Sequence, residues 1–445
     1  MVLIMNRLSL NNKFYIDRTK ESYQVLPYHI KQYYLSEKKL TNYSQAVTLI
    51  GLRRTGKSTV LVQLWDKFKT EKSVFLEFIK PCNIDVLMNF IDEKQEIDYL
   101  FIDEITFLYG LDTDFHIILN TCSHRGIKLV LTGTNSYLIS EAMYDSAYGR
   151  LDTVFFNPLW FLDLCCITYN SNFEDFYLGK TRLAVNDNPI ISLALNLYQS
   201  IEISFDLHKS TIGGMDTKDF ITAVNIILET LSSNCGLLPK TRFELLIKNY
   251  YISNNIKEDI VSLKHYSVKK IFEIMKALHL IRPLYVFSLE TRQAEREAYY
   301  VSVPALYIDL LQKYNIYSAD IREQKLGYLY ETAIITQILL YIDMTEQNGI
   351  YSIYTIRDDS ETLRCEIDLA IKNVKTNGLL LLEFKKSHKK SGKYFNTKEI
   401  KEYCKEHSSF QCLTVTGDIL PQSKENNPYK VDVSDFLNNL DTYLP

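Results

Sequence analysis

A glycine-rich turn between an apolar run and a helical stretch is the feature that most constrains this chain. The segment from Gly51 to Ser58 is Gly-Leu-Arg-Arg-Thr-Gly-Lys-Ser, and it matches the pattern GxxxxGK[ST] at every fixed position. It follows the strand-like run 46–50 and opens a helical pattern, which is the context that a phosphate-binding loop requires. The sequence therefore predicts a site for nucleotide phosphates between residues 51 and 59.

The loop residues have separate predicted roles. Gly51 and Gly56 let the backbone curl so that N–H groups face the phosphates, and the start of the next helix adds a partial positive charge. Lys57 is expected to reach the β- and γ-phosphates, while the Ser58 hydroxyl binds Mg2+. No guanine-reading N-K-x-D motif is apparent, so the predicted nucleotide is ATP rather than GTP. The other residues predicted to contact the nucleotide are Thr55, Thr59, Arg53 and Arg54, of which the two arginines meet either phosphate or a partner.

Two acidic residues close the apolar run 99–104, Tyr-Leu-Phe-Ile-Asp-Glu. This is the Walker B pattern, in which Asp103 is expected to hold Mg2+ through water and Glu104 to polarise the attacking water as general base. Both acids would emerge at the carboxyl end of a strand, where ligands sit in open α/β sheets. An ordinary acidic turn is the alternative interpretation.

A third apolar run, Val130-Leu131-Thr132-Gly133-Thr134-Asn135, ends in small polar residues. Asn135 is the preferred sensor of the γ-phosphate or the attacking water, Thr132 is its competitor, and a simple turn is the alternative. Arg150 follows Gly149 beyond this run. It is predicted to reach a γ-phosphate in its own subunit or in a neighbouring subunit of a homo-oligomer, because such arginines stabilise transition-state charge. A surface ion pair is the alternative for Arg150.

The spacing of apolar runs predicts an α/β chain of three domains. Five short runs in the first third, with helical stretches between them, indicate a doubly wound parallel sheet; they are 46–50, 74–79, 99–102, 128–132 and 154–156. A P-loop ATPase domain with an N-terminal extension is therefore expected over 1–165. A helical lid and a winged helix are expected over 166–315, because an amphipathic helix at 267–280 precedes a strand pair at 284–288 and 298–303.

The last domain, 316–445, has the predicted element order α-β-β-β-α-β, and acidic residues mark its strands. Glu383 and Lys385 share one strand face, and so do Glu366 and Asp368. If these faces converge, they form the D…ExK constellation of restriction-type nucleases. The carboxylates would bind one or two Mg2+ ions, with Glu331 completing the set, and Lys385 would orient water or neutralise the phosphate. The alternative is a non-cleaving relative whose acids serve as surface charge or in binding.

The chain as a whole resembles a prokaryotic family of AAA-type P-loop ATPases that carry a C-terminal restriction-endonuclease-like, PD-(D/E)xK domain. The resemblance implies a cytoplasmic, nucleic-acid-linked ATPase. Asn157 stands where the family has a leucine and Phe384 where it has a valine. The resembling segments are Gly51–Ser58, Phe101–Glu104, Leu131–Asn135, Gly149-Arg150 with Phe156–Leu159, Glu366–Asp368 and Glu383–Lys385.

The composition limits the partners of such a protein. A net charge of -4 argues against a uniformly basic nucleic-acid surface, so any DNA contact would need a local patch. The eight cysteines show no CxxC spacing, which favours reduced thiols in the cytoplasm over a zinc or redox site. No signal peptide is visible and no run approaches about 18 apolar residues, so no membrane span is expected.

Two hypotheses about function follow. The first is a Mg2+-dependent ATPase that controls a winged helix and a nuclease-like domain acting on DNA or RNA. The second is a nucleotide-operated oligomeric switch or scaffold, whose C-terminal domain binds a partner without cleaving it. Glu104 favours turnover, and the combination of Asp368, Glu383 and Lys385 favours cleavage.

Overall fold

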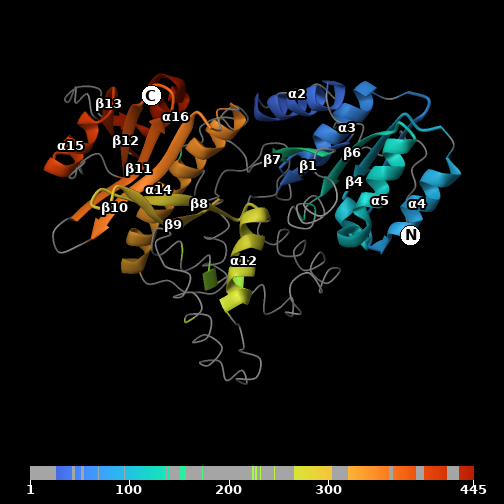
Figure 1. The fold of residues 1–445 in the computed structure, drawn as a ribbon, viewed down its shortest axis with the longest axis horizontal. Coiled ribbons are helices and arrows are strands. Elements are labelled where there is room, and N and C mark those ends of the chain that lie inside the picture. Colours follow the sequence, from blue (N-terminus) through green and yellow to red (C-terminus); the bar gives the residue numbers. More distant parts are fainter. Residues whose placement is uncertain are drawn as a thin grey trace. The chain divides into compact units, whose positions relative to one another are not determined.

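The chain forms two compact units (Figure 1). The first comprises residues 1–159, 192–223 and 269–279, and the second comprises 160–191, 224–268 and 280–445. The computed structural model describes residues 27–42, 46–51, 55–68, 70–94, 96–133, 135, 139, 151–156, 173, 223–224, 226–227, 231, 245, 265–302, 319–345, 347, 349–359, 364–386, 395–417 and 430–445.

A five-stranded parallel sheet forms the centre of the first unit, in the order β2-β4-β6-β1-β7. All five strands predicted from the apolar runs are present. The strand β6 lies between β1, which leads into the phosphate loop, and β4, which ends in the acid pair. The strands are β1 (Ala46–Gly51), β2 (Ser73–Glu77), β4 (Tyr99–Asp103), β6 (Lys128–Gly133) and β7 (Leu151–Phe156).

Helices cover both faces of this sheet, as a buried parallel sheet requires. Val60, Leu61 and Leu64 of α3 pack with residues of β1, β4, β6 and β7 in one core cluster. Residues of α4 and α5 pack against the same strands in a second cluster. The helices are α2 (Pro27–Asn42), α3 (Lys57–Phe68), α4 (Ile84–Glu93) and α5 (Leu111–His124), with the 3-10 turn η2 (Ile105–Phe107) and the short strands β3 (Cys82–Asn83) and β5 (Leu108–Tyr109).

The second unit contains a seven-stranded mixed sheet in the order β14-β13-β12-β11-β10-β8-β9. Its later part follows the predicted order α-β-β-β-α-β, from α14 to β13. The strands are β8 (Ile281–Ser288), β9 (Gln293–Val301), β10 (Tyr351–Asp359), β11 (Arg364–Asn373), β12 (Gly378–Lys385), β13 (Ser409–Thr416) and β14 (Lys430–Asp432). The helices are α14 (Ala319–Met344), α15 (Lys398–Lys405), α16 (Val433–Asn438) and α17 (Leu440–Tyr443).

The hairpin that was predicted as a wing lies in this sheet instead. The helix α12 (His265–Ala277) and the antiparallel pair β8–β9 are present, but β8 also pairs in parallel with β10. The buried Asp358 side chain fixes this join, because it accepts hydrogen bonds from the Ser288 hydroxyl at 2.6 Å and from the Leu289 N–H at 2.7 Å. The predicted boundary at residue 315 therefore does not separate the hairpin from the C-terminal sheet.

The helices α14 and α15 cover opposite faces of the second sheet. Ile356 of β10 packs in one core cluster with Ile400 and Tyr403 of α15. The next residue, Arg357, pairs with Glu331 of α14. Because adjacent strand residues point to opposite faces, the Arg357 side of the sheet is distinct from the α15 side.

Candidate functional site

The ends of the phosphate loop have backbone conformations that suit glycine. Gly51 has a φ of 148°, and a Cβ atom there would lie 2.1 Å from the Phe156 carbonyl oxygen. Gly56 has a φ of 92°, a region that other residues rarely adopt. Arg53 and Arg54 lie outside the described residues, whereas Thr55 and Thr59 are described and buried.

Lys57 is the first residue of α3 and is buried, at 4% exposure. Its ammonium group donates a hydrogen bond of 3.0 Å to the Gly51 carbonyl oxygen, which holds the side chain back over the loop. The helix begins at once, with the Val60 N–H donating to the Gly56 carbonyl at 3.0 Å. A positive charge and a helix N-terminus therefore meet at the loop, as phosphate binding requires.

Ser58, Asp103 and Thr132 form one hydrogen-bonded chain across the carboxyl ends of the strands. The Ser58 hydroxyl donates to Asp103 Oδ1 at 3.0 Å, and the Thr132 hydroxyl donates to the same oxygen. Thr132 reaches Asp103 because its strand, β6, is the direct neighbour of β4. The structure thus brings together the two residues that the sequence predicted as Mg2+ ligands, Ser58 and Asp103.

Burial is the main reason why the pKa of Asp103 is raised, to about 6. The nearby Glu104 carboxylate raises this pKa further, whereas the hydrogen bonds from Thr132 and Ser58 lower it. A cation beside Asp103 would favour the ionised carboxylate and offset the free-energy cost of burying its charge.

Glu104 has a left-handed backbone with a φ of 56°, which is uncommon for residues other than glycine and often occurs at functional sites. Its N–H donates to the Thr132 hydroxyl at 3.1 Å, and its carboxylate accepts a hydrogen bond from the Thr106 hydroxyl at 3.4 Å. Thr132 therefore links the two acids of the Walker B strand. Thr106 had no predicted role, because it lies in a 3-10 turn without a recognised motif.

The two sensor candidates occupy different places. Thr132 is fully buried at the end of β6, where it contacts Asp103 and Glu104. Asn135 is also buried, at 5% exposure, and its carbonyl accepts a hydrogen bond from the Ile139 N–H at 3.3 Å. Arg150 lies outside the described residues, so its role stays a prediction.

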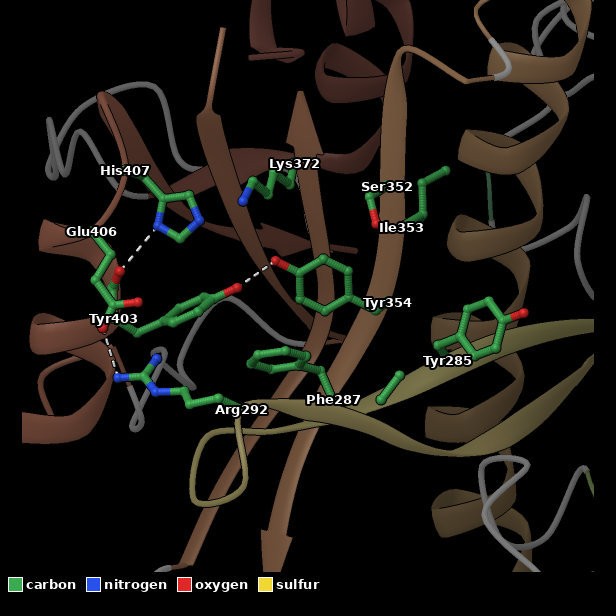
Figure 2. Close-up of a pocket in the computed structure, with 11 residues that line it drawn as sticks. Tyr285, Phe287, Arg292, Ser352, Ile353, Tyr354, Lys372, Tyr403, Glu406 and His407 are labelled. Atoms are coloured by element: carbon green, nitrogen blue, oxygen red, sulfur yellow. Dashed lines mark hydrogen bonds and ion pairs between the residues drawn. The ribbon is translucent and has the colours of Figure 1, made fainter. Parts of the chain in front are cut away.

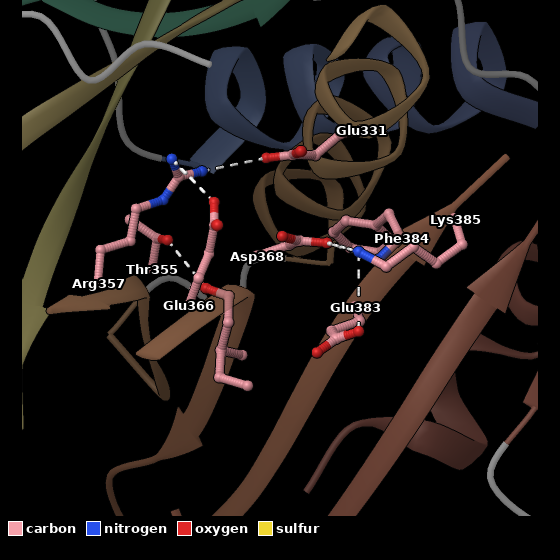
Figure 3. Close-up of polar contacts among 9 residues, drawn as sticks. Glu331, Thr355, Arg357, Glu366, Asp368, Glu383, Phe384 and Lys385 are labelled. Atoms are coloured by element: carbon pink, nitrogen blue, oxygen red, sulfur yellow. Dashed lines mark hydrogen bonds and ion pairs between the residues drawn. The ribbon is translucent and has the colours of Figure 1, made fainter. Parts of the chain in front are cut away.

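In the second unit, Lys385 lies between the two carboxylates predicted to share its site (Figure 3). Its Nζ is 3.8 Å from Asp368 Oδ2 and 3.7 Å from Glu383 Oε2. Asp368 Oδ2 also accepts a hydrogen bond of 2.7 Å from the Phe384 N–H. The three side chains therefore converge, a point that the sequence left open, because it predicted only which residues share a strand face.

Burial and charge act together on this group. Burial raises the pKa of Asp368, while Lys385, the Phe384 N–H and Arg357 lower it. Burial lowers the pKa of Lys385, but the surrounding carboxylates outweigh it and raise that pKa overall, with Asp368 the largest contributor. The lysine is thus held as a cation by the acids around it.

Glu331 belongs to a neighbouring ion-pair group. Arg357 Nη2 lies 3.5 Å from Glu331 Oε1, and Arg357 Nη1 lies 3.1 Å from Glu366 Oε1 (Figure 3). The predicted carboxylate set is therefore divided between Lys385 and Arg357. Among the described residues, no group of three or more acidic, histidine or cysteine side chains is placed to hold a metal ion.

Residues 43–165 match the family model described as an AAA domain. This range contains the phosphate loop, the Walker B acids and the sensor candidates. It forms an AAA-type P-loop ATPase domain. In the described part of the chain, no helix is both long and apolar enough to cross a membrane.

Solved structures resemble the chain at low identity. They include a Walker-type ATPase of Pyrococcus abyssi (15% identity, 65% of this chain, 96% of that chain, TM-score 0.37). The Aeropyrum pernix Orc1 protein in complex with DNA has 13% identity and a TM-score of 0.26, and the match covers 65% of this chain and 96% of that chain. The replication initiator DnaA bound to AMPPCP and single-stranded DNA has 14% identity and a TM-score of 0.23, and the match covers 61% of this chain and 92% of that chain. No curated protein matches the chain.

Proposed function

We propose that this protein is a Mg2+-dependent ATPase. The observation that supports this function best is the series of hydrogen bonds that links Ser58, Asp103 and Thr132, beside the buried Lys57. It gathers a hydroxyl, a carboxylate and an ammonium group at the carboxyl ends of neighbouring parallel strands, where α/β sheets bind ligands. The AAA-type domain over residues 43–165 agrees with it.

The residues present fit Mg2+. The Ser58 hydroxyl and the Asp103 carboxylate share a hydrogen bond of 3.0 Å, and both are oxygen donors. Mg2+ in nucleotide sites takes only one or two protein carboxylates, with phosphate oxygens and waters as its other ligands. When bound, Mg2+ neutralises charge on the β- and γ-phosphates.

The chain's own residues supply the remaining steps. Lys57 leaves the Gly51 carbonyl to contact the β- and γ-phosphates. Glu104 accepts a proton from the attacking water. Thr132 and Thr106 hold Glu104 in position through their hydrogen bonds to it. Thr55, Thr59 and the loop N–H groups around Gly56 contact phosphate, and further contacts are assigned to Asn135, Arg53, Arg54 and Arg150.

Binding of Mg2+-ATP to the Lys57→Ala variant tests the proposed phosphate site. Equilibrium dialysis with labelled ATP is expected to show at least 100-fold weaker binding. The matched control is Lys67→Ala, because Lys67 lies at the other end of α3 and pairs with Glu37 on the surface. Binding by Lys57→Ala as tight as that of the control would contradict the site.

A second candidate function, phosphodiester cleavage in nucleic acid, is favoured by the convergence of Lys385 with Asp368 and Glu383. With one or two Mg2+ ions, the carboxylates would hold metal and Lys385 would neutralise the phosphate. Glu331 would join this set only by leaving Arg357. The proposed partner is nucleic acid, most simply DNA, and the ATPase would control the cleavage in a cytoplasmic protein.

Cleavage assays separate this function from a non-cleaving switch or scaffold. Single- and double-stranded DNA and RNA are incubated with Mg2+ or Mn2+ and full-length protein. Cleavage is expected to fail in Asp368→Ala and to persist in Lys57→Ala and in Glu402→Gln, an exposed-residue control on α15. If the wild type cleaves none of them, and light scattering shows that ATP changes its mass, the homo-oligomeric switch is the better account.

A further inference from the structure

A cavity of about 600 Å³ opens on the side of the second sheet that α15 covers (Figure 2). Residues of β8, β9, β10, β11 and α15 and of the adjoining turns line it. Its lining includes none of the carboxylates that surround Lys385. Tyr354 of the cavity packs with Tyr403 of α15, whereas Arg357 faces α14. The volume suits a small organic ligand.

Aromatic rings form the apolar part of the cavity. The Phe287 ring centroid lies 5.4 Å from that of Tyr354 and 5.6 Å from that of Tyr403. The hydroxyls of Tyr354 and Tyr403 are 2.6 Å apart, which fixes both rings. Tyr285 also lines the cavity and keeps 59% of its surface exposed. Exposed aromatic faces of this kind stack on planar rings.

The charged groups give the lining a net positive charge. Arg292 Nη2 lies 2.7 Å from Glu406 Oε1, and the Arg292 guanidinium carbon lies 5.3 Å from the centroid of the Tyr403 ring. Arg292 and Lys372 contribute two positive charges and Glu406 one negative charge, so one positive charge remains when His407 is neutral. A cavity with this charge attracts an anionic group.

His407 adds a hydrogen-bond acceptor. Its Nδ1 lies 3.0 Å from the Tyr403 carbonyl oxygen. A carbonyl oxygen only accepts, so Nδ1 carries the proton and Nε2 is the acceptor of the neutral ring. Burial, and then the charges of Lys372 and Arg292, lower the pKa of His407 against the effect of this hydrogen bond, which favours the neutral form.

We propose that this cavity binds a nucleotide, with its base stacked on Tyr285 and Phe287 and its phosphate held by Lys372 and Arg292. An uncharged apolar ligand would not use the cations, and a simple anion would not use the rings. The nucleotide is either a free mononucleotide or an unstacked residue of a single strand. This site is separate from the phosphate loop and does not rest on ATP hydrolysis or on cleavage at Lys385.

The test uses the full chain without added ATP or ATP analogue, because such a nucleotide would compete for the proposed cavity. The variants separate the cavity from the phosphate loop, because Lys372 and Tyr285 line the cavity and are not part of the loop. Two probes distinguish the sources: uridine monophosphate, followed by calorimetry, and a fluorescent oligo(dT) single strand, followed by anisotropy. Lys372→Glu and Tyr285→Ala each remove one half of the proposed recognition. The matched control is Lys375→Glu, an exposed lysine in the turn that follows β11. Each test variant is expected to weaken binding at least tenfold, and the control to stay within twofold.

Uridine monophosphate that binds wild type and loses affinity in both test variants identifies a free nucleotide as the ligand. The same pattern with oligo(dT) alone identifies a residue of a single strand. If neither probe binds wild-type protein, the proposal is wrong. It is also wrong if Lys372→Glu abolishes binding while Tyr285→Ala binds as wild type does, because that result describes a surface charge without stacking.

Discussion

The Ser58 hydroxyl donates a hydrogen bond of 3.0 Å to Asp103 Oδ1, and this contact joins the phosphate loop to the Walker B strand. The two strands that lead to these residues, β1 and β4, are not neighbours, because β6 lies between them. Thr132 at the end of β6 donates to the same oxygen. Asp103 is thus held from both sides in a position that suits a metal ion and a phosphate.

Replacing Thr132 by valine is expected to lower the rate of ATP hydrolysis 10- to 100-fold while ATP binding changes little. The valine keeps the shape but removes the hydroxyl that positions Asp103 and Glu104. Phosphate release gives the rate, and a fluorescent ATP analogue gives the affinity. Asn135→Ala is the comparison, and a loss of rate confined to Asn135→Ala would identify Asn135 as the sensor instead.

Replacing Asp103 by asparagine is expected to raise the melting temperature of the metal-free protein at pH 8 and to raise it less at pH 5. The pKa of Asp103 is raised from its ordinary value of 3.8 to about 6. Its contribution to folding is therefore fully present below pH 3.8 and is lost as the pH rises through about 6. The shift of this pKa corresponds to a free energy of unfolding that is lower by about 3 kcal/mol at high pH.

The neutral asparagine removes the cost of ionising a buried carboxylate. Thermal unfolding at both pH values measures the effect, with the exposed Asp92→Asn as the control. An Asp103→Asn variant that is less stable than wild type at pH 8 would show that the ionised Asp103 carboxylate does not destabilise the folded protein at that pH.

Replacing Gly51 by alanine is expected to destabilise the first unit by about 2–4 kcal/mol, because the new Cβ would lie 2.1 Å from the Phe156 carbonyl oxygen. Relief of this clash requires β1 and β7 to separate, which would also displace the phosphate loop. Thermal unfolding measures the loss. Gly327→Ala in α14 is the control, because nothing lies within 4 Å of its new Cβ; equal stability of the two variants would be inconsistent with the clash.

Replacing Arg357 by methionine is expected to destabilise the second unit by about 3 kcal/mol. The change leaves the carboxylates of Glu331 and Glu366 without their shared cation, and removing one partner of a buried ion pair is costly. The side chains of Arg357 and Glu331 are each only 10% exposed. Urea unfolding measures the change.

The exposed pair of Lys398 and Glu402, 3.9 Å apart on α15, supplies the control for Arg357. Lys398→Met is expected to leave the free energy of unfolding unchanged, because surface ion pairs contribute little. Equal effects of the two substitutions would mean that the Arg357 group has no special role in the fold.

The sequence was most informative where the structure is most buried. The parallel strands of the first unit are continuous apolar runs, because both faces are covered, and their predicted limits agree with the structure to within a few residues. The motif at Gly51 to Ser58 likewise predicted the position of Lys57 and Ser58, because the loop and the helix start are local features.

The features that sequence did not predict depend on contacts between distant segments. The pairing of β8 with β10 relies on Asp358, which is 70 residues from Ser288. The β10–β11 ladder shifts register between Tyr354 and Ile356, whose partners are Ala370 and Ile367, so β11 has an extra residue beside Asp368. Such a bulge re-aims side chains. The pairing of Glu331 with Arg357 was missed for the same reason, since it joins a helix to a strand.

ATP turnover by Glu104→Gln tests the central claim most directly. In the presence of Mg2+, wild-type protein is expected to release phosphate from ATP, whereas Glu104→Gln binds ATP with similar affinity and turns over at least 100-fold more slowly, as loss of a general base predicts. Glu93→Gln, at an exposed position in α4, should hydrolyse ATP as wild type does. Wild-type turnover in the Glu104→Gln variant, or no hydrolysis of ATP by the wild type, would contradict the account.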